Sequence, residues 1–133
     1  AALKMITDME RIGDQAENVA EIISFLDDHT IADDPLMGAM ARAVIAMVTE
    51  SVDAFVKHDI MLAEKVVGDD DVVDDYFNKI KQSLIQKIAA NPKEGSCALD
   101  LMIIAKYYER IGDHAVNIAE WVIFSVTGVH KEE

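Results

Sequence analysis

The chain has 133 residues, of which 51% are hydrophobic and 28% charged, and its formal net charge at pH 7 is -13. The length suits one domain with a sizeable core, while the negative charge argues against nucleic acid or an anionic membrane surface as a partner and favours cations or basic protein surfaces. A single cysteine excludes an intrachain disulfide, and no apolar run approaches the roughly 20 residues of a membrane span, so we expect a cytoplasmic protein without membrane insertion.

Apolar spacing predicts helix in almost the whole chain, and no stretch shows the two-residue alternation of a strand. In the first helix, apolar residues follow one another at alternating spacings of four and three from Met5 to Leu26, and this seam ends before a break over residues 29–33. An isolated amphipathic helix draws most of its stability from packing. The seam must therefore be buried, either on the rest of the chain or on a second copy, and we predict a homodimer.

Cap signals open the next two helices. Asp34 followed by Pro35 is an N-cap with proline at the first helical position, and the second helix runs to about Lys57. Asp59 caps a third helix, which should stop ahead of the Asn-Pro pair at 91–92, because the residue before a proline avoids helical geometry.

Ser96 is the expected cap of the fourth helix, which ends at Gly128, a C-terminal cap. Residues 129–133 would then form a tail. Four long antiparallel helices with short connections make a bundle, so we predict an all-α fold.

A twelve-residue segment occurs twice, ninety-nine residues apart, and nine of its twelve positions are identical. Repetition of this length indicates that one supersecondary unit was duplicated. Each copy begins Glu-Arg-Ile-Gly-Asp, at Glu10 and at Glu109. At about 100° per residue, Glu10 and Asp14 lie opposite the apolar seam of their helix, and Glu109 and Asp113 reproduce the arrangement.

Carboxylates four residues apart on a helix stand about 6 Å apart at their roots, where their repulsion is unfavourable and a cation would relieve it. No lysine lies four residues away to neutralise them. The third helix has a further pair at this spacing, at the edge of its seam, so a face built from Asp70, Asp74, Glu109 and Asp113 is geometrically possible. Oxygen ligands without histidine or cysteine favour hard cations such as magnesium, manganese or ferric iron over a closed structural zinc site.

For one such pair, the simpler interpretation is a solvated face opposite an apolar seam. Because the pair is duplicated, and both copies keep the glycine and the asparagine, a cation site becomes as plausible as a solvated face. Gly13 and Gly112 should each cost about 1 kcal/mol in a helix interior, so we expect a neighbouring helix to approach closely there. His114 stands where the first copy has Gln15, and we expect it at the surface rather than as a ligand; the seven methionines are expected to fill the core.

The duplicated Glu-Arg-Ile-Gly-Asp-x-x-x-Asn-Ile/Val-x-Glu pattern, with Asp70-x-x-x-Asp74 ahead of its second copy, resembles the PhoU family of bacterial and archaeal phosphate-signalling proteins. The likeness extends from residue 1 to about Gly128. It implies a protein of two three-helix repeats, in which residues 1–28 are the last helix of the first repeat and residues 34–128 are a complete second repeat. The opening two helices of the first repeat are missing from the sequence.

The resemblance also implies a metal site and a role. Family members bind multinuclear iron or zinc clusters through Glu/Asp-x-x-x-Asp motifs on the bundle surface. The residues carried over by position are Asp70, Asp74, Glu109 and Asp113 for one complete site, and Glu10 and Asp14 for half of another. The implied role is not catalytic: the protein would be a negative regulator of phosphate uptake and phosphate-starvation signalling, joining the ATPase of a phosphate-specific ABC transporter to a sensor histidine kinase.

Two other classes are open. A metal-free helical adaptor that only dimerises is the stronger one. A ferritin-like carboxylate enzyme would also be a helical bundle, but its chemistry expects Glu-x-x-His facing the interior, and no glutamate here is followed three residues later by histidine. We find no glycine-rich phosphate loop and no recognisable nucleophile motif, and we expect no direct phosphate binding to so acidic a surface without a bridging metal.

Overall fold

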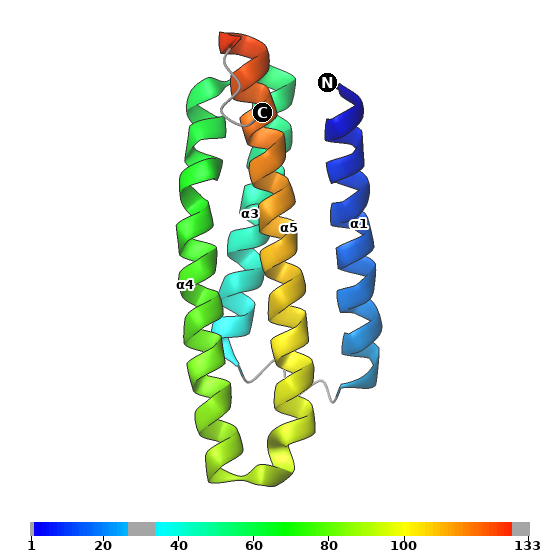
Figure 1. Ribbon diagram of the computed structural model, residues 1–133, viewed down its shortest axis with the longest axis vertical. Coiled ribbons are helices and arrows are strands. Elements are labelled where there is room, and N and C mark those ends of the chain that lie inside the picture. The colour runs from blue at the N-terminus through cyan, green and yellow to red at the C-terminus, as the bar shows by residue number, and fades with distance from the viewer. Residues whose placement is uncertain (1, 27–33, 129–133) are drawn as a thin grey trace.

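The computed structural model describes residues 2–26 and 34–128, and there it consists of α-helices joined by short connections (Figure 1). The all-α prediction is confirmed. The predicted break over 29–33 and the tail at 129–133 lie outside the described residues. The elements are α1 (Ala2–Phe25), α3 (Pro35–Lys57), α4 (Ile60–Ala90), the 3-10 turn η1 (Pro92–Glu94) and α5 (Gly95–Thr127).

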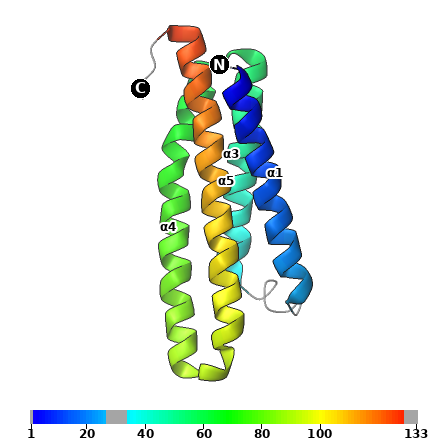
Figure 2. The ribbon, with the colours of Figure 1, turned by 45° about the vertical axis from the view of Figure 1, so that its right-hand side comes forward.

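Three of the helices, α3, α4 and α5, pack on one another as a bundle, and α1 lies along α5 at its side (Figures 1 and 2). α1 runs antiparallel to α5, and α4 runs antiparallel to both α3 and α5. The apolar seam of α1 therefore packs on its own chain, which was one of the two alternatives, and Met5 and Val19 are buried there while Ala16 stays exposed. No helix among the described residues is both long and apolar enough to cross a membrane.

The predicted caps of α3 and α4 are present. The Asp34 carboxylate accepts hydrogen bonds from the backbone N–H groups of Leu36, at 3.0 Å, and Met37, at 3.3 Å. The Asp59 carboxylate accepts one from the N–H of Leu62 at 3.1 Å. Each cap satisfies donors that the first helical turn leaves without a partner, so the helices begin where the sequence indicates.

The predicted start of α5 is wrong by a few residues. The Asn91 side chain accepts a hydrogen bond from the N–H of Lys93 at 3.3 Å and opens η1. This turn leads directly into α5, because Gly95 already has right-handed helical angles. Ser96 therefore lies inside the first turn, and Glu94 precedes the helix without a side-chain cap. The predicted end is confirmed, since Gly128 closes α5 with a left-handed φ of 76°.

The core lies between α3, α4 and α5 and contains aliphatic and methionine side chains. The largest side chains that are fully buried include Met37, Met40, Met47, Ile80, Ile104 and Ile118. Methionine fills the core on α3 as expected, because its flexible chain adapts to irregular space. Met61 is the exception, with 81% of its surface exposed near the start of α4.

The two copies of the repeat have different surroundings. On α5, Ala105 and Ala115 are fully buried, whereas their counterparts ninety-nine residues earlier on α1, Ile6 and Ala16, are exposed. One face of α5 is thus covered by α3 and α4, while the same face of α1 is open in the part of the chain that the structure describes. An apolar groove of about 320 Å³ lies between α1 and α3, with Tyr108 of α5 among its lining residues.

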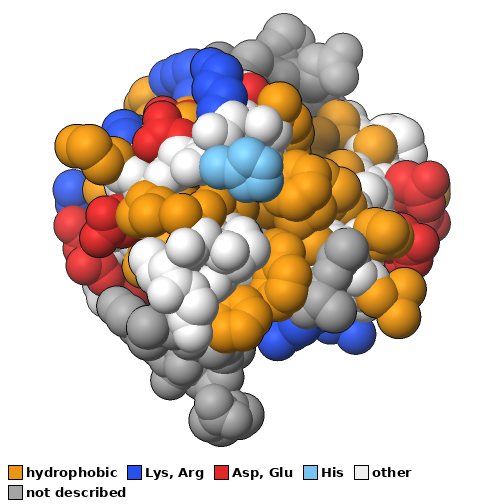
Figure 3. All heavy atoms as spheres, turned by 90° about the horizontal axis from the view of Figure 1, so that it is seen from above, with side chains coloured by type: hydrophobic (Ala, Val, Ile, Leu, Met, Phe, Trp, Pro, Cys, Tyr) orange, Lys and Arg blue, Asp and Glu red, His pale blue; other side chains and the backbone are white. Residues whose placement is uncertain are grey.

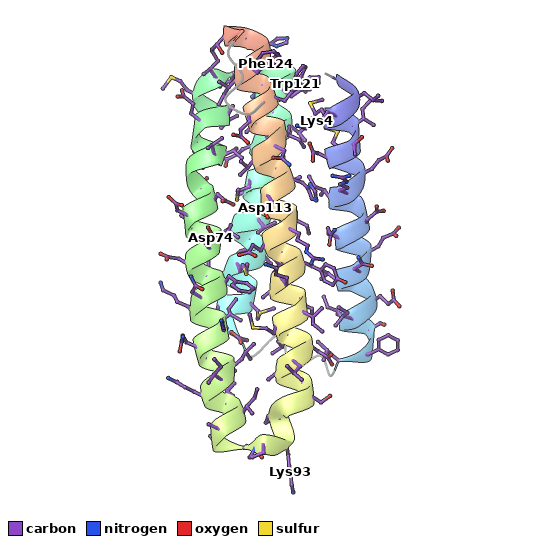
Figure 4. All side chains as sticks on the ribbon, viewed as in Figure 1. Lys4, Asp74, Lys93, Asp113, Trp121 and Phe124 are labelled. Carbon is purple, nitrogen blue, oxygen red and sulfur yellow. The ribbon has the colours of Figure 1, made fainter. Side chains whose placement is uncertain are left out.

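The end of the molecule where α1 begins and α5 finishes is partly apolar. Figure 3 looks onto this end and shows hydrophobic side chains gathered across its middle, with acidic side chains at its margins. Trp121 and Phe124 of α5 contribute a tilted aromatic pair there, with ring centroids 5.3 Å apart. Figure 4 shows this pair above Lys4 of α1, at the same end of the molecule.

Candidate functional site

Carboxylates from α4 and α5 gather near the middle of the two helices, where these helices pack against each other. Figure 4 shows Asp74 on α4 and Asp113 on α5 at similar heights. The negative charges of Asp74, Glu109 and Asp113 are among the causes that raise the pKa of Asp70, and the charge of Glu109 also raises the pKa of Asp74 and of Asp113. We call the set formed by Asp70, Asp74, Glu109 and Asp113 the acidic cluster.

Asp70 is the most perturbed member of the acidic cluster. Burial, and after it the negative charge of Asp74, raises the pKa of Asp70 to about 6. Its Oδ1 atom is buried and has no hydrogen-bond partner among the described residues. A buried oxygen without a donor costs free energy, so Asp70 is the member that a proton or a cation would relieve most.

The pKa values of Asp74 and Asp113 are also raised, and burial is again the largest cause. Burial first, and then the charge of Glu109 and a hydrogen bond with it, raises the pKa of Asp74. Burial, followed by the charges of Glu109 and Asp74, raises the pKa of Asp113, against a smaller lowering effect of His114 and Lys106. The carboxylates of Asp74, Glu109 and Asp113 therefore lie close enough on the α4–α5 face to repel one another.

The expectation that no lysine neutralises these carboxylates is wrong for Glu109. Lys106, three residues earlier on α5, donates a hydrogen bond to Glu109 Oε1 at 2.6 Å. Its ammonium group also lies 5.4 Å from the ring centroid of Phe77. A spacing of three serves an ion pair as well as a spacing of four, so one member of the acidic cluster already has a cationic partner.

The remaining acidic residues of α4 lie outside the acidic cluster. Asp71 and Asp75 are exposed. Asp69 accepts a hydrogen bond from Lys65 at 2.8 Å. The run of five aspartates therefore divides between the α4–α5 face and the solvent.

Glu10 and Asp14 are not brought into the acidic cluster. Both are exposed on α1, which packs on α5 and not on α4. Their side chains lie opposite the seam that faces α5, as predicted. In the described residues, the second copy of the motif has an acidic helix beside it and the first copy does not.

The donor set of the acidic cluster suits a hard cation, because all its ligand atoms are carboxylate oxygens and one of them is buried without a partner. Within the described residues, however, no three His, Cys, Asp or Glu side chains are arranged so that they could hold a metal ion as they stand. Coordination would thus require rotation of the carboxylates toward a common point.

One polar cluster was missed by the sequence analysis. Asp8, only 3% exposed, lies on the seam of α1, and its Oδ1 atom is 3.0 Å from His114 Nδ1 and 3.3 Å from Asn117 Nδ2. The prediction of a surface His114 is wrong, since 16% of its side chain is exposed. An aspartate between Met5 and Ile12 was the available signal.

The expected close approach at the repeated glycines is absent. A Cβ built on Gly112 would lie 3.7 Å from Val73 and 3.8 Å from Met47, which is ordinary contact, and one built on Gly13 would have nothing within 4 Å. Helix packing therefore does not require a glycine at either position.

Comparison with known proteins places these features in a family. Residues 37–122 match the PhoU domain. A phosphate-specific transport system accessory protein, PhoU homolog 1, from Thermotoga maritima is 35% identical over 133 residues, which are 98% of this chain and 57% of that protein. A PhoU homolog from Caulobacter vibrioides is 34% identical, and the alignment covers 96% of this chain and 56% of that protein.

A solved structure agrees. The crystal structure of PhoU from Pseudomonas aeruginosa is 33% identical and superimposes with a TM-score of 0.84 over 95% of this chain and 61% of that one. The chain thus spans somewhat more than half the length of these relatives. Because the PhoU domain matches most of the chain's length, the chain belongs to the PhoU family.

Proposed function

We propose that the chain acts in negative regulation of phosphate uptake and phosphate-starvation signalling, as a cytoplasmic adaptor between the ATPase of a phosphate-specific ABC transporter and a sensor histidine kinase. The observation that carries the proposal is the acidic cluster, built between two helices of a chain in a family whose relatives are named phosphate-specific transport system accessory proteins. The role is one of binding rather than catalysis.

In this proposal the acidic cluster takes up metal. Asp70, Asp74, Glu109 and Asp113 supply the ligands, and the buried oxygen of Asp70 supports this assignment. The family resemblance favours an iron or zinc cluster, and the oxygen-only donor set also suits magnesium or manganese. Glu10 and Asp14 form a half-site. A bound cation would offset the repulsion among the carboxylates and present a fixed pattern of charge to a partner domain.

The proposal includes the organisation of the chain. Residues 1–28 belong to a first repeat and residues 34–128 form a complete repeat, which agrees with the extent of the matched domain. We also propose that the chain forms a homodimer, because apolar side chains such as Leu3, Ile6 and Ile45 are exposed at 74%, 49% and 63%.

Binding measurements test the adaptor role. Biolayer interferometry would use the purified chain with the cytoplasmic region of the kinase and with the transporter ATPase, each with and without added manganese. We expect binding that weakens with salt, because a net charge of -13 implies electrostatic attraction to basic surfaces. The Glu109→Gln/Asp113→Asn variant should bind more weakly than the matched Glu10→Gln/Asp14→Asn variant. Absence of binding to both partners would refute the proposal.

A metal-free adaptor is the second candidate. It is favoured by the Lys106–Glu109 ion pair and by the absence, in the described ranges, of three side chains set to hold a metal. It predicts the same partner binding with and without added manganese and no retained metal. The same series of measurements therefore separates the two candidates.

A further inference from the structure

Lys106 contacts both of the helices that carry the acidic cluster. It extends from α5, donates a hydrogen bond to Glu109 Oε1 at 2.6 Å, and its ammonium group lies 5.4 Å from the ring centroid of Phe77 on α4. Phe77 follows Asp74 by three residues on α4. A cation over an aromatic face is attracted by the ring, so the two contacts together hold a positive charge at the edge of the acidic cluster.

The charge of Lys106 also acts on Asp113. Burial and the neighbouring carboxylates raise the pKa of Asp113, and the charge of Lys106 opposes them. One ammonium group offsets only one of the four carboxylate charges in the acidic cluster. The cluster therefore keeps a negative charge that attracts a further cation.

The two partners of this ion pair differ in their access to water. The Lys106 side chain is 52% exposed and the Glu109 side chain is 16% exposed. A half-exposed ammonium group on a flexible stem returns to water at little cost. Glu109 has less access to water and gains more from a positive partner, whether this partner is the lysine or a metal ion.

We propose that Lys106 is a tethered counterion of the acidic cluster, which neutralises Glu109 in the metal-free chain and competes with a divalent cation for that carboxylate. This role of Lys106 rests on the proposed metal binding. A divalent ion that takes Glu109 as a ligand must displace the ammonium group or accept it at close range, where like charges repel. Lys106 thus lowers the metal affinity and sets the metal concentration at which the acidic cluster fills.

Titration with manganese at neutral pH, with the free ion measured by electron paramagnetic resonance, tests this role. Lys106→Met keeps an apolar stem against Phe77 and removes the charge, so it should bind manganese at least about fivefold more tightly than the wild-type chain. Lys106→Arg keeps the charge and should stay within about twofold of wild type. The matched control is Lys79→Met, which removes one positive charge from an exposed position of α4 and should have no effect.

Urea unfolding in chelator gives a second measurement, which should change in the opposite direction. Without metal, Lys106→Met leaves Glu109 without its cationic partner, so the midpoint of unfolding should fall. Added manganese should then stabilise this variant more than the wild-type chain, because it binds more tightly. A variant that only disturbed packing would lose stability and manganese affinity together.

The outcomes separate this role from the metal site itself. Manganese uptake by the wild-type chain, with unchanged or weaker affinity in Lys106→Met, would overturn the role of Lys106 and leave the metal binding standing. No uptake by either protein would overturn both. Uptake by Lys106→Met that is tighter than that of the wild-type chain, with a lower urea midpoint in chelator, would support both.

Discussion

Asp70 has the most strongly raised pKa in the acidic cluster. Burial raises its pKa to about 6, and the nearby Asp74 adds to the effect. The ordinary value is 3.8, so the folded chain keeps a proton on Asp70 over a range of pH in which the unfolded chain has lost it. This difference links stability to pH.

Because the folded pKa is raised, the contribution of Asp70 to stability is present below its ordinary pKa of 3.8 and is lost as the pH rises through about 6. In chelator, the free energy of unfolding of the wild-type chain should fall between about pH 4 and about pH 6 relative to Asp70→Asn. At about pH 7 the variant should be more stable by about 1 kcal/mol, since solvent screens this half-buried group. Urea titrations across this range would contradict the assignment if the two proteins changed in parallel.

The repeated glycines give a second residue-scale prediction. Since a Cβ finds ordinary contacts at Gly112 and open space at Gly13, Gly112→Ala and Gly13→Ala should each raise the free energy of unfolding by about 0.5–1 kcal/mol. Thermal or urea unfolding measures this. A loss of stability at Gly112 would show that packing there is tighter than the distances indicate.

Residue chemistry was only partly predictable from the sequence. The placement of Asp70 and Asp74 at the edge of an apolar seam follows from helix periodicity alone. Lys106 was missed because only a spacing of four was considered. His114 was assigned to the surface because its partner, Asp8, lies 106 positions away in the chain, and no local pattern reports a contact of that range.

At the scale of elements, helix limits follow from cap chemistry where one side chain decides them. Asp34 and Asp59 each accept backbone hydrogen bonds at the start of a helix, as their sequence context predicted. The prediction that Ser96 caps α5 failed because Asn91 caps a 3-10 turn at Pro92–Glu94 that continues directly into α5. Two adjacent turn signals compete, and the sequence does not say which one the backbone follows.

Asp34 offers the corresponding test. Its carboxylate is 4% exposed and caps α3, while Lys87 Nζ lies 3.7 Å from its other oxygen, beyond hydrogen-bond range. Asp34→Ala should lower the free energy of unfolding by about 1–2 kcal/mol, mainly through the lost cap. Lys87→Ala should cost much less, because its side chain is 51% exposed. Equal losses in both variants would show that the ion pair matters as much as the cap.

At the scale of the molecule, the bundle could be predicted because every helix carries one apolar seam and the connections are short. The position of α1 could not, since its seam would serve equally well on its own chain or on another. The structure places it on α5, where the two motif copies differ: the second has α4 beside it, and the first has an open face. Within the described residues, the two copies of the duplicated segment therefore have different surroundings.

Phosphate binding gives a whole-molecule prediction. The net charge of -13 and the acidic cluster repel anions, so the metal-free chain should show no binding of inorganic phosphate at millimolar concentration. Isothermal titration calorimetry in chelator checks this. Measurable heat of binding with a Kd in the millimolar range or below would mean that a phosphate site exists elsewhere on the surface.

We propose that the acidic cluster, and not the repeated motif by itself, takes up metal. The most direct measurement is equilibrium dialysis of the metal-free chain at about pH 7 against manganese, zinc or ferrous iron, with bound metal determined by elemental analysis. We expect stoichiometric uptake that Asp70→Asn/Asp113→Asn weakens by at least about tenfold and Glu10→Gln/Asp14→Asn leaves unchanged. No uptake of any of the three metals, or equal loss in the two variants, would contradict it.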